Sequence, residues 1–336
     1  MIGLAEIIAG LMAVALNAYA LTGGADFGGG VWDLLATGPR RERQRELIAE
    51  SIAPIWEANH VWLIVVVVVL FAAFPAAFST LGIVLHIPIT LMLIGIVLRG
   101  SAFAFRSYGP HGRSRAVWGT AFAGASIVTP LVLGVIIGAI AAGDVSAAAM
   151  RLQAADARFA EVFVRPWAAP FPLTVGAFAL ALFAFLAATY LTVDTEDKAL
   201  QDDFRARALA AAAVVFLCAA AALVVAHATA PVLATGVAGA LPIQAATAVS
   251  AIGAIVALWR RQYRAARVAA AAQVSLILWG WLLAQYPMLI PPMLSIRETA
   301  APAVTLRLLA FGLAGGALIL LPSLRYMLRT FKSTPR

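Results

Sequence analysis

The sequence predicts an all-α fold, a polytopic membrane bundle of about nine transmembrane helices, and three observations support it. Hydrophobic residues make up 63% of the 336 residues, charged residues make up only 12%, and the mean hydropathy is +0.93. The apolar residues form runs long enough to cross a hydrocarbon core about 30 Å thick as helices. Basic residues collect in alternate connections between these runs. A soluble domain of 35.1 kDa could not cover so much apolar side chain, which excludes cytosolic enzymes and secreted modules.

Nine runs are long enough to be spans, and they are too long and too uniformly apolar for barrel strands. They lie near 3–22, 53–78, 80–99, 117–142, 167–192, 207–228, 243–259, 265–286 and 304–328. The first run is not interpreted as a cleaved signal peptide, because Glu6 stands where a basic segment is expected. The seventh run is the weakest prediction, because it is short and rich in small residues.

We expect a single integral membrane domain over residues 1–336. Eight helices and one more would permit two four-helix units, about 1–142 and 167–286, plus a ninth helix at 304–328. The connection at about 143–166 has room for one short amphipathic helix on the membrane surface.

The basic residues predict the orientation of the bundle. Most of the 24 Lys and Arg residues fall in alternate connections and in the C-terminal tail. The positive-inside rule assigns that side to the cytoplasm, with the N-terminus outside and the C-terminus inside. The net charge of +8 does not indicate nucleic-acid binding, because the arginines are scattered between apolar runs and form no basic stripe on one surface.

The segment from Trp56 to Trp62 opens the second run and carries the best candidate for a functional acid. An ionisable group inside a span costs about 2.5–3.5 kcal/mol on insertion scales, so it calls for a reason. Helical spacing brings Trp56, Asn59 and His60 near one another and pairs Glu57 with His60. Glu57 could be a buried, proton-exchanging carboxylate. It could equally be an acid stabilised by the dipole at a helix N-terminus, and both interpretations stay open.

Metal and haem sites receive less support from the residues. Glu57-x-x-His60 resembles half of a di-iron carboxylate site, but the spans carry no second copy and too few carboxylates. His60, His86 and His227 could each be an axial haem ligand, although a hydrogen-bonded packing role is the stronger expectation for each. The lone Cys218 excludes a disulfide framework and a thiolate metal site. We expect no metal ligand in this chain.

The glycine-dense connection at 22–33 carries two acids, Asp26 and Asp33. It lacks the Gly-Lys-Ser/Thr ending of a phosphate-binding loop, and it follows a membrane helix instead of a strand, so nucleotide binding is not expected. The glycines are expected to let the chain turn sharply at the membrane surface and to let helices approach closely. Asp26 is expected to hold an arginine from a neighbouring helix. Arg106 is expected to extend to the cytoplasmic interface.

Together these residues resemble subunit II of the cytochrome bd-type quinol oxidases. The Trp-acid-x-Asn-x-Val-Trp core and its distance from the Asp-Phe-Gly element are specific. The resemblance covers about residues 10–135 by motif, and beyond about 140 it rests on size, span number and topology. The matching segments are 26–30 (Asp-Phe-Gly-Gly-Gly), 51–63, 98–100 (Leu-Arg-Gly) and 105–107 (Phe-Arg-Ser).

The resemblance implies a heterodimer with a larger, haem-bearing subunit I in the bacterial cytoplasmic membrane. The complex would oxidise quinol and reduce dioxygen to water, and it would be electrogenic through proton uptake. Haems b and d and most of the quinol site would belong to subunit I, so this chain would ligate none. Membrane lipid, a structural quinone and a small single-helix accessory subunit are compatible further partners.

The resemblance also suggests roles for individual residues. Glu57 matches the family acid at which a proton path from the cytoplasm begins, and Asp26 and Arg99 match positions that flank this entrance. Some members carry an acid where this chain has Ala104, so a relay of two carboxylates does not transfer. His60 or Ser101, together with water, is expected to replace it.

Three residues of the motif core, Trp56, Asn59 and Trp62, are the candidates for contact with a cofactor.

The competing class of protein is a secondary transporter or another non-redox helical membrane protein. Pro88 and Pro130, inside predicted spans, would suit the broken helices of transporters. Purification distinguishes the classes, because an oxidase would yield a red complex with a haem-bearing partner.

Overall fold

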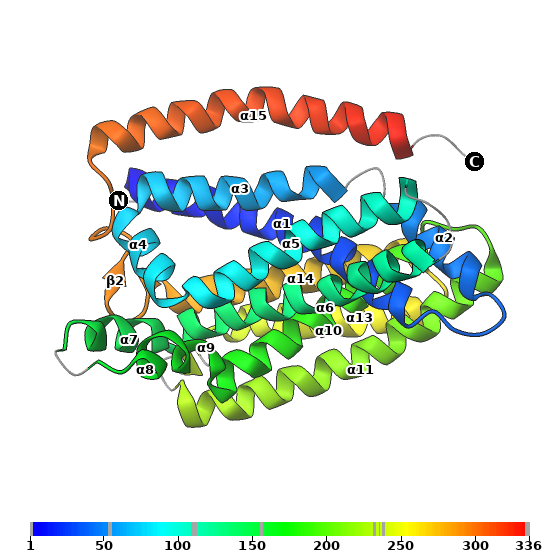
Figure 1. The fold of residues 1–336 in the computed structure, drawn as a ribbon, viewed down its shortest axis with the longest axis horizontal. Coiled ribbons are helices and arrows are strands. Elements are labelled where there is room, and N and C mark those ends of the chain that lie inside the picture. The colour runs from blue at the N-terminus through cyan, green and yellow to red at the C-terminus, as the bar shows by residue number, and fades with distance from the viewer. Residues whose placement is uncertain are drawn as a thin grey trace.

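The structure is a computed structural model that describes residues 3–52, 56–108, 113–154, 157–230, 233–234, 236 and 239–332. Long helices lie side by side and form one bundle (Figure 1). The elements are α1 (Leu4–Leu34), α2 (Arg41–Ile52), α3 (Trp56–Ala73), α4 (Pro75–Val84), α5 (His86–Tyr108), α6 (Arg113–Ala142), α7 (Asp144–Leu152), α8 (Phe159–Phe163), α9 (Arg165–Ala168), α10 (Pro170–Leu191), α11 (Lys198–Thr229), α13 (Leu241–Trp259), α14 (Tyr263–Gln285), β1 (Met288–Ile290), β2 (Leu294–Ser295) and α15 (Ala303–Lys332).

Among the described residues, eight helices are long and apolar enough to cross a membrane, or nine if α3 and α4 count as one bent span. The eight are α1, α5, α6, α10, α11, α13, α14 and α15. The predicted helical membrane bundle is confirmed, and the short seventh run is present as α13. The described strands β1 and β2 pair in an antiparallel hairpin, which is a small departure from an all-α chain.

Helix α1 continues through the glycine-dense segment to Leu34, so the predicted sharp turn is wrong. The glycines serve close helix contact instead, as expected. A β-carbon on Gly28 would collide with the main-chain oxygen of Phe183 on α10. A β-carbon on Gly30 would collide with the Ser126 side chain on α6. The C-terminal half of α1 is therefore buried at the centre of the bundle, against α6 and α10.

The second predicted span, at 53–78, is broken. Helix α3 ends at Ala73, and α4 begins at Pro75 with a bend of 115° between them. Proline lacks the N–H that a continuing helix needs but fits the first turn of a new one, which explains the break. The third predicted span consequently starts later than residue 80, at His86 of α5.

Of the two prolines that suggested broken helices, Pro88 follows a break, because the predicted third span is interrupted at Leu85 between α4 and α5. Pro88 lies in the first turn of α5, and α6 continues through Pro130.

At one end of the bundle, the connection at 143–166 forms three short helices, α7, α8 and α9, where one was expected. Ser146 of α7 donates a hydrogen bond to the Pro291 carbonyl oxygen (2.7 Å), which links α7 to the loop between β1 and β2.

Helix α15 lies along one edge of the bundle, next to α3 (Figure 1). Most of its apolar side chains are exposed, and Phe311 and Leu318 are 76% and 78% exposed. In contrast, α6 and α10 are largely covered by their neighbours. The interior of the bundle is therefore organised around α1, α6 and α10.

Candidate functional site

A fully buried ion pair joins α1 to α5. The Arg99 guanidinium donates to both carboxylate oxygens of Asp26 at 2.6 and 2.9 Å and to its main-chain oxygen at 3.1 Å. The third guanidinium nitrogen, Nε, donates to Ser126 Oγ at 3.0 Å. The rings of Phe27 and Phe122 each lie 4.9 Å from the Arg99 Cζ atom. Every nitrogen of the guanidinium therefore has an acceptor. Asp26 was expected to hold an arginine from a neighbouring helix, and this arginine is Arg99.

A second ion pair repeats this arrangement seven residues further along both helices. Arg106 donates to the two carboxylate oxygens of Asp33 at 2.7 and 2.8 Å. Arg45 of α2 donates to the Asp33 main-chain oxygen at 3.2 Å and lies 4.0 Å from its carboxylate. The Phe122 ring lies 5.9 Å from the Arg106 Cζ atom, so the same ring contacts both guanidinium groups.

The expectation that Arg106 extends to the interface is therefore wrong. Its side chain is only 18% exposed, because a carboxylate on the neighbouring helix holds it inward. The sequence did contain a signal for this pair. Asp26 and Asp33 are seven residues apart, as are Arg99 and Arg106, and a seven-residue spacing returns to nearly the same face of a helix. The signal was missed because a turn was expected between the two acids.

The start of α3 packs against α5 between the two arginines. The Trp56 ring lies 5.7 Å from the Phe103 ring, and a β-carbon on Gly100 would lie 2.9 Å from Trp56. Glu57 belongs to the first turn of α3 by its backbone, whereas its side chain lies outside the described residues. Trp56, the residue before Glu57, therefore contacts the part of α5 that lies between the two arginines.

Asn59 and His60 face α1. Asn59 is 3% exposed, and its amide donates to the Thr22 main-chain oxygen at 3.4 Å. The His60 ring lies 6.0 Å from the Tyr19 ring and 6.4 Å from the Phe27 ring. Within the described part of the chain, the buried His60 Nδ1 atom has no hydrogen-bond partner. The structure thus brings His60 next to Phe27, the residue that stacks on Arg99.

The remaining candidates lie near these groups without joining them. Ser101 and Ala104 are half-buried on α5, and Trp62 is half-buried on α3. Trp62 packs against the same apolar core as Trp56. Among the described contacts, neither Ser101 nor Trp62 hydrogen-bonds to a residue of either ion pair.

The histidines do not form a metal or haem centre in the described part of the chain. No three His, Cys, Asp or Glu side chains gather there as metal ligands. The Nδ1 atom of His86 lies 2.9 Å from the Ile83 carbonyl oxygen, and that of His227 lies 2.8 Å from the Leu223 carbonyl oxygen. Both contacts are to the main chain within the preceding turn.

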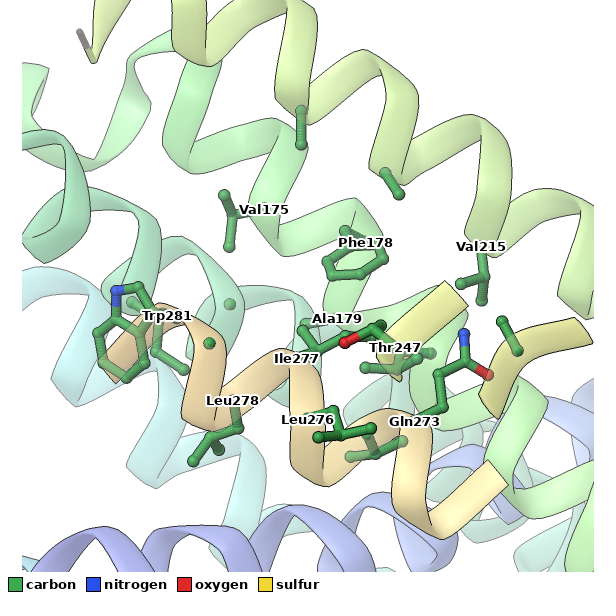
Figure 2. Close-up of a pocket in the computed structure, with 18 of the residues that line it drawn as sticks. Val175, Phe178, Ala179, Val215, Thr247, Gln273, Leu276, Ile277, Leu278 and Trp281 are labelled. Carbon is green, nitrogen blue, oxygen red and sulfur yellow. The ribbon is translucent and has the colours of Figure 1, made fainter. Parts of the chain in front are cut away.

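A cavity of about 710 Å³ opens between α1, α6, α10, α11, α13 and α14. Figure 2 shows that Phe178 and Ile277 line it, with Gln273 and Trp281 at separate places along its wall. Gln273 is 7% exposed, and the buried indole N–H of Trp281 has no hydrogen-bond partner among the described residues. Tyr19 lines this cavity and also contacts His60. Trp56, Asn59 and Trp62, the expected cofactor contacts, do not line it.

No local sequence signal pointed to this cavity, because its wall comes from six helices that are far apart in the sequence. It is apolar with a few polar groups, which is the usual composition of a binding site for a hydrophobic small molecule.

The fold and the two ion pairs define a polytopic helical membrane protein with paired acids and arginines inside its bundle. The chain belongs to the cytochrome bd terminal oxidase subunit II family, whose family model matches residues 4–331. This match confirms the family resemblance and extends it over nearly the whole chain.

Individual relatives agree with this membership. The chain is 31% identical over 153 residues to cytochrome bd ubiquinol oxidase subunit 2 of Bacillus subtilis (strain 168), covering 46% of this chain and 45% of that protein. It is 34% identical over 133 residues to cytochrome bd-I ubiquinol oxidase subunit 2 of Escherichia coli (strain K12), covering 40% and 35%. Each alignment thus spans less than half of the curated relative.

The fold is similar to a chain of the bd oxidase structure from Geobacillus thermodenitrificans. The TM-score is 0.81 at 20% identity, and the match covers 99% of both chains. At this identity the comparison shows the fold alone.

Proposed function

We propose that this chain is subunit II of a cytochrome bd-type terminal quinol oxidase in the bacterial cytoplasmic membrane. It would pair with a larger subunit I, support the oxidation of quinol and the reduction of dioxygen to water, and take up protons from the cytoplasm. The family match over residues 4–331 supports the assignment. The buried Asp26–Arg99 pair beside the start of α3 carries the proposal for proton uptake.

Electron transfer from quinol to dioxygen would take place at haems b and d of subunit I. The protons consumed in forming water must then cross protein of low dielectric constant. A carboxyl group in such surroundings is harder to ionise, so it can take up a proton near neutral pH. We assign this step, the uptake of a proton, to Glu57 at the beginning of α3. The proposed orientation has the N-terminus of the chain outside the membrane and its C-terminus on the cytoplasmic side.

The neighbours of Glu57 suit this step. Asp26 and Arg99 neutralise each other, so they provide hydrogen-bonding groups without leaving a net charge beside the proton route. His60 has a buried ring nitrogen without a partner among the described residues, which could hydrogen-bond to a water molecule. His60 and Ser101 are the proposed relay beyond Glu57, in place of the acid that some members have where this chain has Ala104.

The cavity between α1, α6, α10, α11, α13 and α14 is the proposed place for a structural quinone or a lipid tail. Its volume of about 710 Å³ falls within the range of about 300–1,000 Å³ that is typical of small-molecule sites. Gln273 and the indole N–H of Trp281 could hydrogen-bond to quinone oxygens, while Phe178 and Ile277 contact apolar parts.

The test is Glu57→Gln in the whole complex, purified from the membrane with its partner subunit. We expect slower oxygen consumption with quinol as the donor and haem absorbance close to that of the wild type. Glu57→Asp, which keeps the carboxyl group, is expected to retain more of the rate. Full turnover of a well-assembled Glu57→Gln complex would refute proton uptake at Glu57, and a colourless chain that purifies alone would refute the oxidase assignment itself.

A further inference from the structure

The cavity between the six helices reaches the surface of the bundle between α11 and α13. Phe216 and Leu223 of α11 and Ile252 of α13 line the cavity, and they are 72%, 50% and 61% exposed. Side chains that line an enclosed cavity would be covered by their neighbours. Both helices are long and apolar enough to cross a membrane, so this opening faces the hydrocarbon core of the bilayer.

One end of the same two helices is closed. The Arg205 guanidinium of α11 donates to the main-chain oxygens of Leu258 (2.7 Å) and Trp259 (3.3 Å) at the end of α13. Ala208 of α11 and Ala254 of α13 are fully buried in the core beside this contact, and small residues let helices pack closely in a membrane. The opening is therefore bounded by a fixed contact, which lies on the cytoplasmic side in the proposed orientation.

The cavity is long and runs parallel to the helices. Its wall includes α11 from Ala212 to Ala226 and α13 from Ala240 to Ile255. At a rise of about 1.5 Å per residue, each stretch is about 20 Å long, which is a large part of the hydrocarbon core of about 30 Å. This shape suits an extended hydrocarbon chain better than a compact solute.

Two polar side chains of α14 interrupt the apolar wall. Gln273 and Trp281 lie at opposite ends of the stretch of α14 that lines the cavity (Figure 2), about 12 Å apart along the helix axis. The buried indole N–H of Trp281 is a donor without a partner among the described residues, so an oxygen acceptor in the cavity would satisfy it. Trp281 lies one turn before the end of α14 at Gln285, and Trp residues are enriched at this level, beside the lipid head groups.

We propose that a long-chain lipid with a carbonyl group at its head enters the cavity sideways from the bilayer, through the opening between α11 and α13. Its carbonyl oxygen accepts the Trp281 N–H, and its chain extends along α11 and α13 toward the closed end at Arg205. An isoprenoid quinone and a phospholipid share this chemistry. The inference rests on the proposed occupancy of the cavity, and it adds the route of entry and the position of the head.

The test is the exchange of bound lipid in the purified complex. The complex is placed in bilayers of deuterated phosphatidylethanolamine and phosphatidylglycerol that also contain deuterated ubiquinone and menaquinone. It is then extracted again at successive times and washed in detergent, and the retained molecules are measured by mass spectrometry. Labelled quinone or labelled phospholipid in the washed complex identifies which of the two enters the cavity.

Two substitutions change the opening in opposite directions. Ile252→Trp narrows it and is expected to slow exchange several-fold, whereas Phe216→Ala widens it and is expected to speed exchange. The matched controls are Val249→Trp and Leu217→Ala, because these residues are exposed on the same helices, at 70% and 65%, but do not line the cavity. Both controls are expected to exchange at the wild-type rate. Haem absorbance checks that each complex is assembled.

Trp281→Phe tests the position of the head. Loss of one hydrogen bond, worth about 0.5–1.5 kcal/mol, is expected to weaken retention about two- to tenfold. Trp279→Phe is the control, since Trp279 lies on the same helix and does not line the cavity. Equal retention in the two variants would overturn the contact with Trp281.

The outcomes separate this inference from the proposal on which it rests. Exchange at equal rates in each variant and its control, with lipid still retained, would overturn entry between α11 and α13 and leave the cavity an occupied site. A wild-type complex that retains no quinone or phospholipid after washing would overturn the occupancy itself. If Ile252→Trp does not assemble, Phe216→Ala, which only removes atoms at the surface, still decides the question.

Discussion

Gly28 of α1 lies so close to Phe183 of α10 that no side chain fits between the two backbones. This contact explains why glycine lies within helix α1 at this position. Close backbone contact favours association of helices in a membrane, where small residues allow van der Waals packing over a large area. The glycines thus hold α1 at the centre of the bundle.

Gly28→Ala is expected to destabilise the subunit, because the new methyl group would overlap the Phe183 carbonyl and force α1 away from α10. Overpacking of this kind costs about 1–3 kcal/mol. The melting temperature of the purified complex measures the effect. Gly10→Ala in the same helix is the matched control, since nothing lies within 4 Å of that position. Equal melting temperatures for the two variants would contradict the close contact.

Asp26→Asn is expected to reduce the yield and stability of the complex strongly. It leaves the Arg99 guanidinium buried without a counter-charge, and breaking a buried pair from one side costs about 3–5 kcal/mol. The double variant Asp26→Asn/Arg99→Gln is expected to recover part of this loss, because it buries no charge. The yield of haem-containing complex and its melting temperature check both statements. No recovery in the double variant would indicate that the hydrogen bonds matter more than the charges.

His60→Phe tests the proposed relay separately from packing. A phenyl ring suits the aromatic contacts with Tyr19 and Phe27 but has no ring nitrogen, whereas His60→Gln keeps a polar group. We expect both variants to assemble, with His60→Phe slower in oxygen consumption than His60→Gln. If both variants turn over at the wild-type rate, His60 is a packing residue only.

Ala219→Phe tests the proposed occupant of the cavity. The residue lines the cavity from α11, and a phenyl ring there would fill part of its volume. We expect less quinone or lipid in an extract of the purified complex, measured by mass spectrometry. Ala220→Phe is the control, because Ala220 is the next residue of the same helix and is exposed. An unchanged extract from Ala219→Phe would argue against an occupant at this site.

The helical membrane fold could be predicted from the sequence because hydrophobic length and charge placement are local properties. The details that were missed depend on contacts between distant residues. Local glycine density indicated a turn before residue 34, but the contact between Gly28 and Phe183 needs two helices that are far apart in the chain. Phe74 and Pro75 carry a local signal for the break in the second span, because proline disfavours a helical conformation in the residue before it.

The candidate site was predicted only in part, because some of its contacts also join residues that are distant in the sequence. The motif around Glu57 marks one stretch of one helix, and it could be found without knowledge of the fold. The partner of Asp26 could be anticipated as an arginine, whereas the pairing of Asp33 with Arg106 requires α1 to remain helical past residue 30. The cavity could not be predicted, since its wall forms only when six helices have packed together.

The two ion pairs also have a consequence for the synthesis of the chain. In each pair the acid precedes its arginine by 73 residues, so α1 enters the membrane before either counter-charge has been translated. At about 5–20 residues per second the ribosome needs roughly 4–15 s to reach the arginines. Because both arginines lie on α5, both acids gain their partners when this single helix is inserted.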